Sequence, residues 1–145
     1  MQAARSILLA LATIAVALVT VPAEAADLQV TVTGIRAPVG NVHFAVFVEP
    51  DAFPKEEGII AEIVTKANGE NVQANFDDLG SGQYAIAVFH DENGNREFDT
   101  DFFGFPVEGY GFANNVRVIL GPPSFEAASV VVDSDGAHIT IRITY

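Results

Sequence analysis

Apolar and polar residues alternate along much of this chain, and this pattern constrains the fold more than any other feature of the sequence. The alternation is clearest at the carboxyl end, where every second residue is apolar or aromatic: Ile139, Ile141, Ile143 and Tyr145. A period of two is that of a β-strand, in which successive side chains point to opposite faces. Because no helical spacing of apolar residues is sustained after residue 25, the sequence predicts an all-β protein.

The same alternation predicts further strands, over residues 28–32, 42–48, 59–66, 72–77, 84–89 and 128–133, before the last strand over 138–145. A turn at 38–41 is predicted to join the first two strands as a hairpin with both apolar rows on one face. Residues 52–58 are expected to hold one short helical turn, with Pro54 at its first position. About seven short strands predict a single antiparallel β-sandwich, which we prefer to a closed barrel.

The amino-terminal residues have the pattern of an export signal. Arg5 precedes a run of 15 residues, 7–21, without a charged side chain, and Ala23 and Ala25 then occupy the positions that a signal peptidase reads. The run is shorter than the roughly 20 residues that a membrane-spanning helix needs. We therefore expect a signal peptide over 1–25, one domain over 26–145, no membrane span after cleavage, and a periplasmic or secreted protein.

Composition and charge narrow the function. Half of the residues are hydrophobic, so the chain can build a core. The net charge of −12 argues against nucleic acid, because phosphate binding needs clustered Lys and Arg; it leaves cations and basic partners open. The absence of cysteine excludes thiol nucleophiles, thiolate metal sites and a lipid-modified amino terminus.

One long segment, residues 90–124, breaks the alternation, with a further strand indicated only at 115–120. It holds six aromatic residues: Phe98, Phe102, Phe103, Phe105, Tyr110 and Phe112. A loop of this length in a compact domain is functional or disordered, and the free energy that aromatic side chains gain from burial favours order. We therefore expect one long, aromatic-rich, ordered loop to carry the function.

The first part of this loop has the spacing of a calcium-binding loop. Oxygen-bearing side chains occupy positions one, three, five and nine, with a backbone carbonyl expected from Glu97: Asp91, Asn93, Asn95 and Asp99. Arg96 stands where an EF-hand loop has glycine, and Phe102 stands where it has its closing acid, so Asp101 or Glu108 would have to complete the shell. The alternatives are a weak structural calcium site, with a dissociation constant of about 0.1 to 1 mM, and a metal-free turn in which these side chains cap backbone amides.

The second part suggests a ligand cleft. Its aromatic side chains and a few polar ones could bind a small apolar or aromatic molecule: His90, Phe102, Phe103, Phe105, Glu108, Tyr110, Phe112 and Asn114. The alternative is a small satellite core that seals one end of the sandwich.

Catalytic patterns are weak. The three histidines lie in or at the ends of different predicted strands, and Ser124 lacks the glycine-flanked turn of a hydrolase serine. We therefore expect a non-enzymatic binding or accessory domain whose partner is a small apolar ligand or a periplasmic protein. Two alternatives remain: an interaction module that uses a sheet edge, and a small hydrolase or isomerase that uses His90 with Asp91 or Glu108.

Three segments in the same order resemble a bacterial family known as domain of unknown function 2141: residues 82–95, 104–115 and 121–126. The resemblance covers essentially the whole chain after the signal. It implies a secreted or periplasmic β-sandwich of transthyretin-like or prealbumin-like character with no assigned reaction, and members typically carry glycine where this chain has Arg96. Transthyretin-like hydrolases of ureide intermediates end in Tyr-Arg-Gly-Ser, whereas this chain ends in Arg-Ile-Thr-Tyr, so that activity is not expected here.

Overall fold

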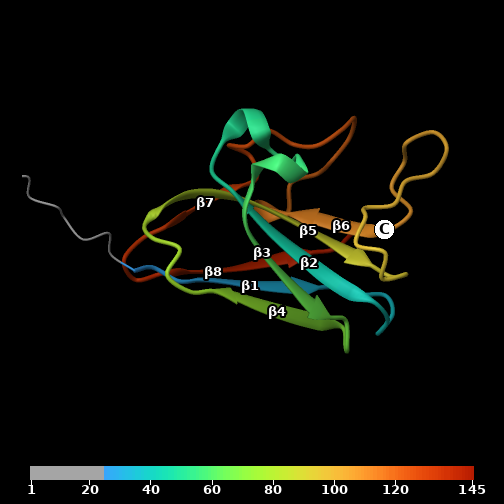
Figure 1. Ribbon diagram of the computed structural model, residues 1–145, viewed down its shortest axis with the longest axis horizontal. Coiled ribbons are helices and arrows are strands. Elements are labelled where there is room, and N and C mark those ends of the chain that lie inside the picture. The colour runs from blue at the N-terminus through green and yellow to red at the C-terminus, as the bar shows by residue number, and fades with distance from the viewer. Residues whose placement is uncertain (1–24) are drawn as a thin grey trace, which may run out of the picture.

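Two packed β-sheets make up the protein in a computed structural model that describes residues 25–145 (Figure 1). The strands are β1 (Leu28–Thr33), β2 (Asn41–Phe47), β3 (Ile59–Lys66), β4 (Asn71–Phe76), β5 (Gly82–Asp91), β6 (Gly109–Phe112), β7 (Ser129–Val132) and β8 (Ala137–Arg142). Three short 3-10 helices accompany them: η1 (Pro50–Ala52), η2 (Glu56–Gly58) and η3 (Ala113–Asn115). The signal peptide expected over 1–25 falls almost wholly outside the described residues. Within residues 25–145, no helix has the length and apolarity to cross a membrane.

One sheet has the strand order β4-β1-β8, and the other has the order β3-β2-β5-β6, with β7 also paired to β5. Every pair is antiparallel except β1 and β8, which run in parallel. The predicted all-β class and two-sheet architecture are confirmed. Each of the seven predicted strands corresponds to an observed one, and β6 is an eighth.

The predicted hairpin between the first two strands is wrong, because β1 and β2 lie in different sheets. Their apolar rows are fully buried but face each other across the interior, with Val30 on β1 and Phe44 on β2 among them. The turn between them crosses from one sheet to the other. Gly40 has a φ of +67° there, and a Cβ at this position would collide with the backbone of Asp91.

Two further predictions need correction. Residues 115–120 form no strand, whereas β6 forms at Gly109–Phe112, where two glycines hide the alternation. Gly111 is required there because an added Cβ would lie 2.7 Å from Ile141 Cγ2 on β8. The expected helical turn at 52–58 is in fact two turns, η1 and η2, and Pro54 lies between them; Pro50 begins the first.

A second apolar cluster covers the outer face of the five-stranded sheet. Phe53 makes edge-to-face contacts with Phe47, Phe112 and Phe125 at centroid distances of 5.1, 5.9 and 6.2 Å. Beneath them the sheet presents small residues such as Ala85, which is fully buried. The five-stranded sheet is therefore covered on both faces over part of its area, and this rigid layer carries the long loop.

Candidate functional site

The loop that joins β5 to β6, residues 92–108, is the candidate site, and Figure 1 shows it projecting beyond the ends of both strands. Its first turn is built on Asp91, the last residue of β5, whose side chain is fully buried. Asp91 Oδ1 accepts the backbone N–H groups of Gly94 and Asn95 at 2.7 and 3.2 Å, and Oδ2 accepts that of Arg96 at 3.0 Å. One buried carboxylate thus satisfies three successive amides, as Asp and Asn side chains do in capped turns.

Arg96 has the left-handed backbone conformation that glycine usually takes, and it stands where an EF-hand loop has glycine. Its φ is +68°, in the left-handed region, which costs a residue with a Cβ roughly 1–2 kcal/mol. Its hydrogen bond to the buried Asp91 carboxylate holds it there. The loop therefore makes the sharp bend without glycine.

The other predicted calcium ligands meet above this turn. Asn93 Nδ2 lies 2.6 Å from Asp99 Oδ2, and Asn95 Nδ2 lies 3.1 Å from both Asp99 oxygens. The side-chain oxygens of Asn93 and Asn95 accept backbone N–H groups of Asn95 and Glu97. Among the residues that the structure describes, no three His, Cys, Asp or Glu side chains form a group suited to a metal ion. The geometry brings Asn93, Asn95 and Asp99 into contact and uses their groups within the turn, so calcium stays a prediction.

Glu108 holds the base of the loop together through hydrogen bonds to the backbone. Its side chain is buried, and its two oxygens accept the backbone N–H groups of Glu92 at 3.0 Å and Asp99 at 3.2 Å. The two ends of the loop are thereby joined to one carboxylate.

The tip of the loop, residues 99–107, is a small hairpin. Asp101 Oδ1 accepts the N–H groups of Phe103 and Phe105, both at 2.9 Å, while Thr100 pairs with Pro106. The ring-bearing residues Phe102, Phe103 and Phe105 are 96%, 81% and 68% exposed. The expectation that these three rings would gain free energy from burial is wrong, because the hairpin holds them away from the sheet.

The remaining aromatic residues of the segment form a row on the outer face of the five-stranded sheet. Phe98 folds back onto the sheet and packs edge-on against Phe89 and Tyr110 at 5.6 and 5.7 Å, and Tyr110 contacts Phe112 at 6.2 Å. His43 stacks on Phe89 at 4.4 Å and extends the row to β2. This row anchors the loop on its scaffold.

His43 forms a buried polar cluster that the sequence analysis did not anticipate. Its Nδ1 lies 2.9 Å from Glu62 Oε1, and its Nε2 lies 3.4 Å from Asp91 Oδ2 without a hydrogen-bond partner among the described residues. The strand register places His43 opposite Phe89, two residues before Asp91. Only that register, which alternation alone does not specify, could have indicated the contact.

His90, a predicted ligand-binding residue, is fully buried. Its Nε2 lies 2.7 Å from the Val39 carbonyl oxygen and its Nδ1 lies 2.7 Å from the Tyr145 hydroxyl. A carbonyl only accepts, so Nε2 carries a proton and donates it; Nδ1 of a neutral ring then accepts from Tyr145. Tyr145 also accepts the Arg36 backbone N–H at 3.1 Å. One nitrogen of His90 therefore holds the turn between β1 and β2, and the other holds the end of the chain.

Arg36 adds charge to this corner. Its guanidinium forms a two-point ion pair with Glu92 and lies 4.2 Å from the centre of the Tyr145 ring. The Arg36 hydrogen bond lowers the pKa of the Glu92 carboxyl below its ordinary value, and burial raises the pKa of the Tyr145 hydroxyl. The ion pair links the β1–β2 turn to the first residue of the loop.

The structure does not bring the eight predicted ligand residues around one cavity. Asn114 donates from Nδ2 to the carbonyls of Ala127 and Ser129 at 3.0 and 2.9 Å. Tyr110 and Phe112 line a groove of about 540 Å³ on the side of β6 away from β5, and neither Phe103 nor Phe105 lines it.

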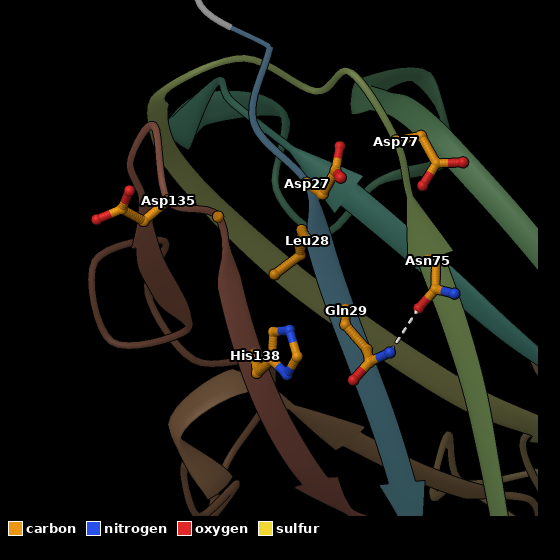
Figure 2. Close-up of a pocket in the computed structure, with 8 residues that line it drawn as sticks. Asp27, Leu28, Gln29, Asn75, Asp77, Asp135 and His138 are labelled. Carbon is orange, nitrogen blue, oxygen red and sulfur yellow. Dashed lines mark hydrogen bonds between the residues drawn. The ribbon is translucent and has the colours of Figure 1, made fainter.

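A second depression, of about 270 Å³, lies over the β4-β1-β8 sheet and is lined by polar residues. Figure 2 shows that the carboxylate of Asp135 points away from those of Asp27 and Asp77, and that His138 lies beside Gln29. These carboxylates do not converge, so this depression is a weaker candidate than the loop.

Comparison with known families gives one result. Residues 30–140 match the model of a family described as "Uncharacterized protein conserved in bacteria (DUF2141)". The chain belongs to this family. The resemblance stated above is thereby confirmed. In this member the first of the three segments supplies Asp91, which caps the turn, and the second supplies Glu108 and η3. Comparisons with curated proteins and with solved structures give no match.

Proposed function

We propose that this domain is a non-enzymatic binding module of the periplasm or the secreted space, and that the loop tip, residues 99–107, is its contact surface for a partner protein. The observation that carries the proposal is the exposure of Phe102, Phe103 and Phe105 on a hydrogen-bonded hairpin. Full burial of one such ring is worth about 1.5–3 kcal/mol, so three of them could supply most of the affinity of a specific complex.

The tip is held in place before any partner arrives. Asp101 bonds the tip from within, Glu108 joins its base, and Phe98 anchors it to the sheet. A partner would therefore bind without first ordering the loop, and that entropy cost is one of the main terms opposing association. Exposed aromatic residues on a braced element are typical of interaction sites.

The charged residues around the loop tip indicate what kind of partner surface would be complementary to it. Glu97, Asp99 and Asp101 flank the phenylalanines, and Arg96 is the one basic residue of the loop. Complementarity predicts a partner with an apolar recess and a basic rim.

The environment of two of the three histidines, His43 and His90, supports a non-enzymatic role. His90 is fully buried with both ring nitrogens bonded, and His43 is buried between Glu62 and Asp91. Neither presents a free nitrogen to a substrate in solution, as general acid–base catalysis requires.

A photo-crosslinking phenylalanine analogue tests the proposal when it replaces Phe103 in the full chain expressed in its own cells. The matched control carries the analogue at Val131, which is 72% exposed on β7, away from the loop. We expect one crosslinked partner from position 103, absent from position 131 and weakened by salt. Equal capture at both positions, or none at 103, would refute the proposal. A crosslinked dimer of this chain would show instead that the loop tip binds a second copy of the same protein.

We propose calcium as a second ligand of the same loop, bound by Asp91, Asn93, Asn95 and Asp99 with the carbonyl of Glu97. The contact of Asn93 and Asn95 with the Asp99 carboxylate supports it, since these side chains already meet at one place. A cation there would require both amides to turn their oxygens inward and to give up the backbone N–H groups that these oxygens accept. Calcium would then stiffen the loop rather than take part in chemistry.

A further inference from the structure

The groove beside β6 is independent of the loop tip. It has a volume of about 540 Å³ and lies between β6, residues 115–119 and the end of β8. Its apolar lining comes from Tyr110, Phe112, Val116, Val118 and Ile119. This volume is within the range of about 300–1,000 Å³ that small-molecule sites occupy.

The charged residues that line the groove are opposite in sign to the net charge of the chain. The sequence has 7 basic and 19 acidic residues, yet the charged residues that line the groove are Arg117 and Arg142. Within residues 25–145 neither arginine forms an ion pair with a carboxylate. The two guanidinium groups therefore lack a counter-charge, and an anion in the groove would supply it.

The walls of the groove are built by an unusual backbone. Asn114 and Asn115 have φ values of +60° and +51°, and their side chains act as substitute strand partners. Asn115 Oδ1 accepts the Arg142 N–H at 2.7 Å and its Nδ2 donates to the Thr140 carbonyl at 3.2 Å, while Asn114 bonds the end of β7. Such strained positions persist only where several bonds hold them, and they are enriched at ligand sites.

We propose that this groove binds a small amphipathic anion, with an apolar chain or ring system along Tyr110, Phe112 and Val118 and one carboxylate held by Arg117 and Arg142. An arginine fork matches the geometry of a carboxylate, and the apolar lining accommodates the rest of the molecule. The size of the groove favours a small molecule over a peptide segment, which would extend beyond the described lining.

Decanoate, used below its micelle concentration, is the test ligand, and amide NMR shifts of the ¹⁵N-labelled domain report its position. We expect saturable shifts confined to residues 110–119 and 140–144. The double variant Arg117→Gln with Arg142→Gln is expected to weaken binding at least tenfold. The control Lys55→Gln with Lys66→Gln removes the same number of positive charges at exposed positions that do not line the groove, and it leaves binding unchanged. Decanol, with the same chain and no charge, is expected to bind at least tenfold more weakly.

Three outcomes would overturn the proposal. Shifts that do not saturate, or that lie outside the groove, would show that decanoate has no site there. If decanol binds as tightly as decanoate, or if the double variant binds decanoate as tightly as the native chain, the arginines do not hold the carboxylate. A hexapeptide with an apolar carboxyl end that binds more tightly than decanoate would make the occupant a protein terminus. Because both arginines are exposed, the double variant should fold, and its melting temperature checks this.

Discussion

Replacing Asp91 by Asn is the sharpest test of how the loop is held. The exchange keeps the shape of the side chain but turns one acceptor into a donor that faces the Arg96 N–H, so this part-buried bond is lost. An unpaired amide costs about 1–3 kcal/mol, and the bonds to Gly94 and Asn95 lose about 1 kcal/mol each without the charge. The lower cost of burying a neutral amide offsets part of this loss. We expect a net loss of about 3 kcal/mol.

Thermal unfolding followed by circular dichroism measures this loss, which for a domain of this size corresponds to a fall of about 10 °C in melting temperature. Asp101→Asn is the matched control, because Asp101 also accepts two amides through one oxygen but is exposed, and Asn can keep both bonds. We expect less than 1 kcal/mol there. If Asp91→Asn costs no more than Asp101→Asn, the buried carboxylate does not hold the turn and our reasoning fails.

Three further predictions concern the same corner of the molecule. Arg96→Gly should stabilise the domain by about 0.5–1 kcal/mol in urea unfolding, because glycine avoids the strain of a φ of +68° at a smaller entropy cost; a loss of stability would contradict this. The lowered pKa of Glu92 contributes stability above the ordinary carboxyl pKa, and this stability is lost as the pH falls through the folded-state pKa. Glu92→Gln should therefore flatten the decline of the urea midpoint between about pH 5 and pH 3; an unchanged decline would mean that Arg36 does not hold this carboxyl. Millimolar calcium should raise the melting temperature of the native chain but not that of the Asp99→Asn variant. If the native chain melts identically with and without calcium, the loop does not bind the metal.

The alternation of apolar residues was sufficient to predict seven strands and which of their faces point inward. It could not assign strands to sheets, because Val30 and Phe44 satisfy the same pattern whether β1 and β2 pair or face each other. It also missed β6, where Gly109 and Gly111 replace the expected apolar residues because β8 passes too close for side chains.

The location of the candidate site was predictable, and its construction was only partly so. The spacing of Asp91, Asn95 and Asp99 correctly indicated an Asx-rich turn, because contacts within a few residues follow from local sequence. The exposure of Phe102, Phe103 and Phe105 was not predictable from hydrophobicity, since the short hairpin around Asp101 holds them away from the core. The two arginines of the groove are distant in the sequence, and only the folded chain brings them to one place.

The parallel pairing of β1 with β8 joins Leu28 to Ala137 and Thr33 to Arg142, so the first and last strands of the domain are neighbours. The smaller sheet therefore cannot be completed until almost all of the polypeptide has been synthesised, and contacts so distant in sequence form slowly. We expect a nascent chain arrested before β8 to remain sensitive to protease while the finished chain resists it. Such late closure would suit a polypeptide that must stay unfolded while it passes through a translocation channel.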